Sequence, residues 1–204
     1  MADKSKKWVF EREKSALMVI DMQNDFVLNG AIMEVEEAKH QLPKIKNLIA
    51  KCRELHVPIL YTVHETDAVL NPLEIAAFPH LKNAGMRTGT MGVEVVDELE
   101  PQSEDVIIRK KRFSAFYQTD LELILRNMRD GSIDTIIVCG TVTNICCEST
   151  ARDAFFRDYM VVFGSDICSA LTPEAHEATL ANMDIFGRVL DCKSIIEALD
   201  NGKG

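Results

Sequence analysis

Three side chains with complementary chemistry each follow a short apolar run of the sequence. Asp21, Lys110 and Cys146 come at or shortly after the end of such a run. Runs of this length are typical of buried strands, and parallel strands in an α/β sheet present their carboxyl ends at one shared edge. A thiol becomes a nucleophile when a base accepts its proton and a nearby cation stabilises the thiolate. The three residues therefore predict a cysteine nucleophile served by a carboxylate and an ammonium group.

Two adjacent cysteines, Cys146 and Cys147, compete for the role of nucleophile. They lie in a helix-like segment after Gly140, for which Thr143 or Asn144 is the expected N-cap, and the first turn of a helix lowers the pKa of a thiol. Cys147 belongs to a stripe of small residues suited to packing on the sheet, which also contains Thr150, Ala151 and Ala154. Cys146 points about a quarter-turn away and is the predicted reactive thiol. The alternative is that both are buried structural thiols.

Alternating strand-like and helix-like segments must position these residues. Strand-like apolar runs occur at residues 15–20, 59–63, 105–109, 133–139, 159–162 and 188–190. Helical spacing or helix-capping signals occur at residues 35–55, 120–129, 172 onward and 194–199. Strands that alternate with helices predict an α/β fold with one mostly parallel sheet covered on both faces. The 204 residues are expected to form a single domain, 1–204.

The stretch 65–91 has no clear periodicity and is punctuated by proline and glycine. A loop-rich stretch of this length inside a compact domain is usually functional, so we expect a lid or a substrate-facing region. His64 and His80 are possible metal ligands. Two lone histidines without a carboxylate at close spacing are more often loop or surface residues, and the sequence therefore predicts no metal site.

Composition and charge argue against several classes of function. The net charge is −9 and the pI is about 5.1, which disfavours a nucleic-acid or anionic-membrane partner. No apolar run approaches the ~20 residues needed to span a membrane, and the basic N-terminal residues are not followed by the apolar region of a signal peptide. The six cysteines lack paired spacing, which predicts reduced thiols in a cytoplasmic protein.

Three motifs, in order along the chain, resemble those of the isochorismatase-like cysteine hydrolases. They are ALMVIDMQNDF at residues 16–26, KKRFSAF at residues 110–116 and GTVTNICCESTARDA at residues 140–154. The resemblance implies a three-layer α/β/α sandwich with a six-stranded, mostly parallel sheet. It also implies a catalytic triad of Asp21, Lys110 and Cys146, with Lys111 as the alternative lysine.

The resemblance further implies a mechanism. Members of this family commonly have a cis peptide bond before the position four residues ahead of the cysteine, which here is the Thr141–Val142 bond. An oxyanion hole built from the amides of Val142 and Cys146 would hold the charge that develops on the substrate carbonyl. Asp21 would accept the proton of Cys146 and pass it to the leaving nitrogen, while Lys110 stabilises the thiolate.

The cysteine favours hydrolysis of a C–N bond in a small amide, carbamoyl or ureido compound, with release of ammonia through a thioester. Two alternatives within the family stay open, an isochorismatase-type hydrolysis of a vinyl ether and a nicotinamidase activity. The nicotinamidase branch carries a metal site with an Asp-x-His pair after the second strand, where this chain has Tyr61-Thr62-Val63-His64. The resemblance is therefore to metal-free amidohydrolases, such as N-carbamoylsarcosine amidase, and implies no cofactor.

The pocket and the assembly are also expectations from this resemblance. Phe26, Arg112, Phe113 and Phe116 are expected to bind a small-molecule substrate, together with the stretch 65–91. Members of the family usually self-associate, so a homodimer or homotetramer is expected. Outside the hydrolases, two other functions stay open: a thiol redox protein that uses Cys146, and a non-catalytic binding module.

Overall fold

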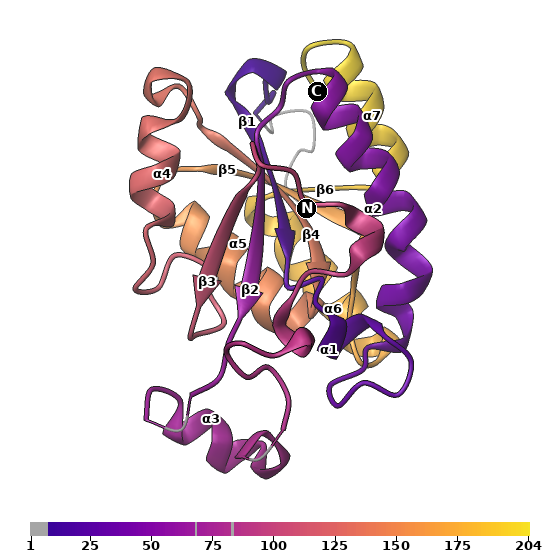
Figure 1. Cartoon of the computed structure of the whole chain (residues 1–204). Helices are drawn as coiled ribbons and strands as arrows, with labels where there is room; N and C mark the ends of the chain where they lie inside the picture. Colours follow the sequence, from indigo (N-terminus) through magenta and orange to yellow (C-terminus); the bar gives the residue numbers. More distant parts are fainter. Residues whose placement is uncertain (1–7, 68, 83) are drawn as a thin grey trace.

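The strand that precedes Asp21, β1 (Ser15–Ile20), lies inside the sheet, between two neighbouring strands. The computed structural model describes residues 8–67, 69–82 and 84–204. Within these ranges, six strands form one sheet in the order β3-β2-β1-β4-β5-β6, and every neighbouring pair is parallel (Figure 1). The other strands are β2 (Ile59–His64), β3 (Val106–Lys110), β4 (Thr135–Thr141), β5 (Met160–Ser169) and β6 (Arg188–Leu190). The expected six-stranded sheet is confirmed, with all of its strands parallel.

Helices cover both faces of this sheet. They are α1 (Asn24–Val27), α2 (Glu36–Glu54), α3 (Pro72–Ala77), α4 (Leu121–Asn127), α5 (Glu148–Phe155), α6 (Pro173–Phe186) and α7 (Cys192–Asp200). Short 3-10 turns occur at Arg12–Lys14, Pro79–Lys82, Met91–Val93, Asp97–Leu99 and Met128–Gly131, and a π-helical turn at Thr143–Cys147. In Figure 1, α2 and α7 lie on one side of the sheet and α4, α5 and α6 on the other. None of the helices in the described ranges combines the length and apolar character that crossing a membrane requires.

Side chains of β1 alternate between two hydrophobic cores. Leu17 and Val19 belong to the core that includes α2 and α7, whereas Met18 and Ile20 belong to the core that includes α4, α5 and α6. A parallel strand that is buried on both faces needs apolar residues at successive positions, which explains the continuous apolar run before Asp21. The two cores therefore hold the carboxyl end of β1 between packed layers.

The structure extends β4 beyond the end that the sequence predicts. A break was expected at Gly140, but the strand continues through this residue to Thr141 and pairs with both β1 and β5. Gly140 has a φ of 117°, and a Cβ atom there would lie 2.1 Å from the carbonyl oxygen of Ile20. The glycine is therefore required for the close approach of β4 to β1, rather than for a turn that ends the strand.

The carboxyl ends of the strands point to one end of the molecule, where the stretch 65–91 also lies. This stretch contains α3 and the turn Pro79–Lys82, and α3 projects beyond the strand ends (Figure 1). Its two ends are joined by a bridge between Thr66 and Arg87. The stretch is thus anchored next to the sheet edge where Asp21, Lys110 and the cysteine segment were expected to meet.

Candidate active site

The structure brings Asp21, Lys110 and Cys146 together at the carboxyl edge of the sheet. Lys110 Nζ lies 2.7 Å from Asp21 Oδ2 and 3.5 Å from Cys146 Sγ, and all three residues are buried. The alternative lysine, Lys111, points elsewhere, since its Nζ contacts Glu65 at 3.0 Å. A carboxylate, an ammonium and a thiol from three separate segments therefore share one buried cluster, in the arrangement that the strand ends predicted.

Two neighbouring strands position Asp21. The residue directly follows β1 with a positive φ of 47°, and its backbone N–H donates to Thr62 Oγ1 on β2 at 3.1 Å. The Thr62 hydroxyl donates in turn to Asp21 Oδ1 at 2.5 Å. A hydroxyl that accepts from the backbone and donates to the carboxylate of the same residue holds that carboxylate in one orientation. The other carboxylate oxygen, Oδ2, is thereby directed to Lys110.

Cys146 lies in the π-helical turn Thr143–Cys147 rather than in the first turn of a regular α-helix. The predicted N-caps Thr143 and Asn144 are wrong: Val142 holds that position and makes no side-chain cap. The backbone N–H of Cys147 donates to the carbonyl of Val142 at 3.2 Å, a bond that spans the wider π turn. The peptide bond Thr141–Val142 is cis, as the resemblance implied.

The two adjacent cysteines have different surroundings, as their helical spacing predicted. Cys147 is fully buried in the core on the α4, α5 and α6 side, together with the small residues Ala151 and Ala154. Cys146 also contacts this core, but it reaches a cavity at the sheet edge. Cys146 is therefore the thiol that a small molecule in the cavity would meet.

The groups of the cluster influence one another's affinity for protons. Burial lowers the pKa of Lys110, but attraction to Asp21 and Cys146 outweighs it, and the pKa of this ammonium lies above its ordinary value. Burial raises the pKa of Cys146; Lys110 opposes this effect and Asp21 adds to it, so the pKa of the thiol lies well above its usual range. The lowered thiol pKa expected at a helix N-terminus is therefore reversed here, because burial and the carboxylate dominate.

Two further residues, His64 and Glu74, complete the cluster. His64 ends β2 opposite Lys110 in the register of β2 and β3, and its Nδ1 lies 3.1 Å from Lys110 Nζ. Its Nε2 lies 2.8 Å from Glu74 Oε1, on α3. An ammonium only donates, so Nδ1 accepts from Lys110, which places the imidazole proton on Nε2, the nitrogen that faces Glu74. The pair connects α3 to the lysine of the cluster.

The sequence indicated His64 as a possible metal ligand and, with weaker support, as the histidine of a Cys-His arrangement, and it did not identify Glu74 at all. The place of His64 at a strand end was a usable signal, because Asp21 and Lys110 also lie at the ends of strands. Glu74 lies on a six-residue helix within a stretch that lacks periodicity, so no local pattern indicated that it would face the cluster. Its identification required the tertiary structure.

A metal ion does not fit this cluster. Within the described ranges, one group of three potential ligands was found, Asp21, His64 and Cys146, whose ligand atoms lie within 4.8 Å of one another. Lys110 Nζ, however, already contacts all three of these side chains. A protonated lysine at the centre of a ligand set repels a cation, so no step of the chemistry below is assigned to a metal. The other histidine considered, His80, is exposed and lies 2.9 Å from the sulfur of Met33.

The cavity at Cys146 has a volume of only about 40 Å³. Its apolar wall consists of Phe26, Met33, Phe78, Met86, Phe113 and Ile145. His64, Glu74 and Val142 also line it. A larger hollow of about 640 Å³ adjoins it, since Glu74, Phe78, Phe113 and Ile145 line both. The small cavity is the place where a reacting group would meet the thiol.

The four residues expected to bind substrate lie in different places. Phe26 and Phe113 line the cavity at Cys146. Arg112 lines the adjoining hollow, and its guanidinium donates to the carbonyls of Lys111 and Leu70. Phe116 is buried in the core on the α4, α5 and α6 side, 6.0 Å from the ring of Tyr159. Their roles in binding stay predictions.

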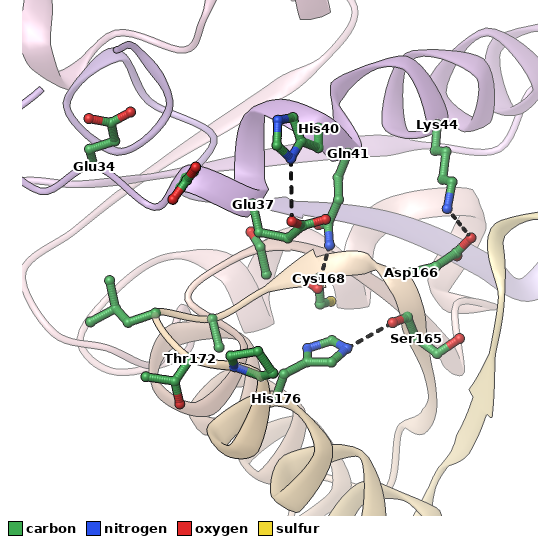
Figure 2. A pocket seen from close by; sticks show the side chains of 15 residues that line it. Glu34, Glu37, His40, Gln41, Lys44, Ser165, Asp166, Cys168, Thr172 and His176 are labelled. Atoms are coloured by element: carbon green, nitrogen blue, oxygen red, sulfur yellow. Dashed lines mark hydrogen bonds and ion pairs between the residues drawn. The ribbon is translucent and has the colours of Figure 1, made fainter. Parts of the chain in front are cut away.

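Another hollow, of about 770 Å³, lies between α2 and the carboxyl end of β5 (Figure 2). In Figure 2, Gln41 reaches from α2 to the carbonyl of Cys168, and His176 bonds to the carbonyl of Ser165. Lys44 pairs with Asp166 across the hollow at 2.8 Å. This hollow is lined by neither the triad residues nor Glu74, so the chemistry of the cluster belongs to the small cavity despite its smaller size.

Comparisons with known proteins identify a matching family and similar relatives. The family described as isochorismatase domain matches residues 15–194 of the chain. Nicotinamidase 3 of Arabidopsis thaliana is 32% identical over 189 residues, covering 91% of this chain and 88% of the relative. A ureidoacrylate amidohydrolase of Acinetobacter baylyi is 28% identical over 216 residues, covering 94% of this chain and 86% of the relative.

A solved structure is similar to this chain over almost its whole length. A cysteine hydrolase from Pseudomonas syringae pv. phaseolicola has a TM-score of 0.91 against this chain at 30% sequence identity. The match covers 99% of this chain and 100% of that one. The fold of this chain is therefore shared with a solved structure described as a cysteine hydrolase.

Proposed function

This chain belongs to the isochorismatase family, and from that premise we propose that it is a cysteine amidohydrolase. The reaction is hydrolysis of a C–N bond in a small amide, carbamoyl or ureido compound, with release of ammonia. The observation that carries the proposal is the position of Lys110 Nζ, within 2.7 Å of Asp21 and 3.5 Å of Cys146. A base, a cation and a thiol in contact are what formation of a thiolate nucleophile requires.

In the first half of the proposed reaction, the Cys146 sulfur attacks the substrate carbonyl while Asp21 accepts the thiol proton. Lys110 stabilises the negative charge that appears on the sulfur during this transfer. The carbonyl oxygen becomes an oxyanion, and we assign the backbone amides of Val142 and Cys146, two residues that line the cavity, to hold it. The pKa of the thiol is high, so proton transfer must accompany the attack.

In the second half, the C–N bond breaks and the nitrogen leaves as ammonia with the proton from Asp21. The product at this stage is a thioester between the acyl group and Cys146. Asp21, again a carboxylate, then removes a proton from water as the water attacks the thioester. The C–S bond breaks, the sulfur recovers a proton and the acid is released, which returns the site to its starting state.

The relatives support this class of reaction. The name nicotinamidase describes an enzyme that acts on an amide, and ureidoacrylate amidohydrolase one that acts on a ureido compound. The substrates in these two names differ in charge and shape, but in both the bond that is cleaved is a C–N bond. We therefore assign the class of reaction to this chain without assigning either substrate.

The stretch 65–91 covers the cavity in which such a substrate would react. This cavity, of about 40 Å³, is much smaller than the several hundred Å³ typical of a ligand site. Phe78 and Glu74, which line it, both belong to this stretch. We propose that the stretch acts as a lid, which opens to admit substrate and closes to exclude water.

The test is ammonia release from a panel of small amides that includes nicotinamide, maleamate, biuret, N-carbamoyl amino acids and ureido acids. The wild type, Cys146→Ala and Cys147→Ala are compared, with and without a chelator. We expect chelator-resistant release from at least one compound, lost by about 10³-fold or more in Cys146→Ala. Cys147→Ala is the matched control and should retain activity, because Cys147 lies in the core. Turnover that survives in Cys146→Ala, or silence of the wild type across the panel, would remove the proposal.

A further inference from the structure

The charges around the cavity at Cys146 are unequal. Asp21 and Lys110 form an ion pair beneath it, and their charges cancel. His64 accepts from Lys110 through Nδ1, as a neutral imidazole does, and its Nε2 faces Glu74 at 2.8 Å. With the thiol protonated, Glu74 is the remaining charge, and it is negative.

Glu74 is held as a carboxylate at this position. Its side chain is 10% exposed, lies 2.8 Å from His64 Nε2 and accepts from Asn71 Nδ2 at 3.0 Å. Burial raises the pKa of Glu74, but hydrogen bonds from His64 and Asn71 and the charge of Lys110 outweigh burial, so the pKa lies below its ordinary value. The carboxylate is thus ionised at neutral pH and faces a small cavity with an apolar wall.

No free cation lines this cavity among the described residues. The side chains that line it include neither lysine nor arginine. Lys110 lies beneath it with its ammonium directed to Asp21, His64 and Cys146. An anionic group in the cavity would therefore meet the carboxylate of Glu74 without a counter-charge, in a place where water screens little.

We propose that Glu74 selects substrates by charge, so that the enzyme acts on amides whose substituent next to the scissile group is uncharged or cationic. The inference rests on the proposed function and narrows its substrate class. Carbamoyl compounds that carry a carboxylate close to the carbonyl are then poor substrates, whereas neutral carboxamides and ureas, or those that carry an amine, are good ones.

The competing reading assigns a carboxylate of the substrate to Arg112. This guanidinium donates from Nη1 to the carbonyl of Lys111 at 2.6 Å and from Nη2 to that of Leu70 at 2.7 Å. It lines the larger hollow and not the cavity at Cys146. A short substrate whose carbonyl sits at the sulfur would leave its carboxylate near Glu74, so the structure favours the reading based on Glu74.

The experiment measures kcat/KM for ammonia release in two series of compounds. Within each series the members are similar in shape and differ in charge. The first is N-carbamoylglycine, hydroxyethylurea and aminoethylurea; the second is meta-carbamoylbenzoate and nicotinamide. The wild type is compared with Glu74→Gln, which keeps the size of the side chain and removes its charge, and with Arg112→Gln as the matched control. The readout is the ratio of kcat/KM for the neutral member of a series to kcat/KM for its anionic member, both measured on the same variant. A general loss of activity lowers both values and leaves this ratio unchanged.

We expect the wild type to prefer the neutral or cationic member by about tenfold or more, and Glu74→Gln to reduce this preference by about tenfold. In Glu74→Gln this change should come from a higher kcat/KM for the anionic member. Arg112→Gln should leave the ratio unchanged. A wild type that prefers the anionic member and loses this preference in Arg112→Gln would overturn the inference. So would a ratio that Glu74→Gln does not change. Both results leave the proposed function standing, whereas that function fails separately if Cys146→Ala retains turnover.

Discussion

Cys146 carries its proton at rest, because burial and the neighbouring Asp21 raise the pKa of the thiol and Lys110 offsets them only in part. In the proposed mechanism the proton therefore leaves as the sulfur attacks, and Asp21 has two opposite effects. It makes the free thiolate less stable at rest, and it provides the acceptor without which the attack stalls. The two effects are separable by mutation.

Asp21→Asn is predicted to abolish hydrolysis while making the thiol easier to ionise. The substitution removes the negative charge that raises the pKa of Cys146 and leaves the opposing charge of Lys110, so this pKa should fall. We expect the midpoint of the rate of alkylation by iodoacetamide to move to lower pH than in the wild type. Mass spectrometry of the labelled peptide assigns the signal to Cys146, and the double variant with Cys146→Ser should lose it. An unchanged midpoint would contradict the assigned electrostatics.

At the scale of elements, the site depends on how closely β4 approaches β1. Ile20 pairs with Gly140 in the register of these two strands, and the next residues along each chain lead to Asp21 and to the cysteine segment. The missing Cβ at Gly140 lets the backbone of β4 pass the carbonyl of Ile20. The separation of the two catalytic candidates is thus set by a contact between main chains.

Gly140→Ala is predicted to destabilise the protein by about 3 kcal/mol or more, or to prevent folding, since its Cβ would lie 2.1 Å from a backbone oxygen. The control is Gly202→Ala, at a glycine that also has a positive φ but no atom within 4 Å of the added Cβ. This control should cost only about 1 kcal/mol, from backbone conformation alone. Urea unfolding of both variants checks the difference, and equal losses would contradict the role of the close contact.

A buried carboxylate ties the end of β2 to the strand beside it. Glu65 is 3% exposed, and it accepts from Arg109, from Lys111 at 3.0 Å and from Thr88 at 3.0 Å. Burial raises the pKa of Glu65, but these hydrogen bonds outweigh burial and hold the pKa below its ordinary value. A depressed pKa in the folded state means that the carboxylate stabilises the fold above its unfolded pKa and loses this effect as the pH falls.

Glu65→Gln is predicted to lower the free energy of unfolding by about 1–2 kcal/mol at neutral pH. The difference in the free energy of unfolding between the variant and the wild type should shrink as the pH falls below about 4.3, the ordinary pKa of glutamate. The wild-type carboxylate then becomes protonated and, like the glutamine, carries no charge. Urea unfolding at neutral and at acidic pH measures both quantities. Glu98→Gln, at an exposed residue, serves as the control and should change little at either pH. A loss that is the same at both values would contradict the linkage.

At the scale of the whole molecule, several large apolar side chains are exposed, and two groups of them are candidate contact surfaces. Val69 and Leu73, in the stretch that carries α3, are 83% and 84% exposed. Phe156 and Ile185, at the ends of α5 and α6, are 72% and 78% exposed. Exposed apolar side chains that gather on a surface often mark contacts with another protein molecule. These patches are the surfaces on which the predicted self-association can be tested.

We predict that light scattering will give a mass of two or four times the 22.9 kDa of one chain. Leu73→Asp and Ile185→Asp each place a charge in one of the two patches, and the variant that disrupts the interface should shift the mass towards that of a single chain. Circular dichroism of each variant verifies that it remains folded. A wild type that remains at the mass of one chain at micromolar concentration would contradict the prediction.

The sequence by itself determined the sheet and the identity of the three central residues. A strand buried on both faces must be a continuous apolar run, and the side chain that follows it must lie at the carboxyl edge of a parallel sheet. Asp21 and Lys110 could be placed from these local rules, and Cys146 could be separated from Cys147 by helical spacing. These inferences needed only neighbouring residues, whereas the choice of Lys110 over Lys111 came from the resemblance to the family.

Tertiary structure alone decided what surrounds those three residues. His64 and Glu74 meet because α3 folds back over the end of β2, and the small size of the cavity depends on side chains from separate segments. Gly140 is a point of close contact between strands and not a chain break. A glycine is needed there because the carbonyl of Ile20, on another strand, occupies the place of a Cβ atom. Contacts between segments distant in sequence leave no periodic trace in either segment. The charge that faces the substrate was therefore visible only once the chain was folded.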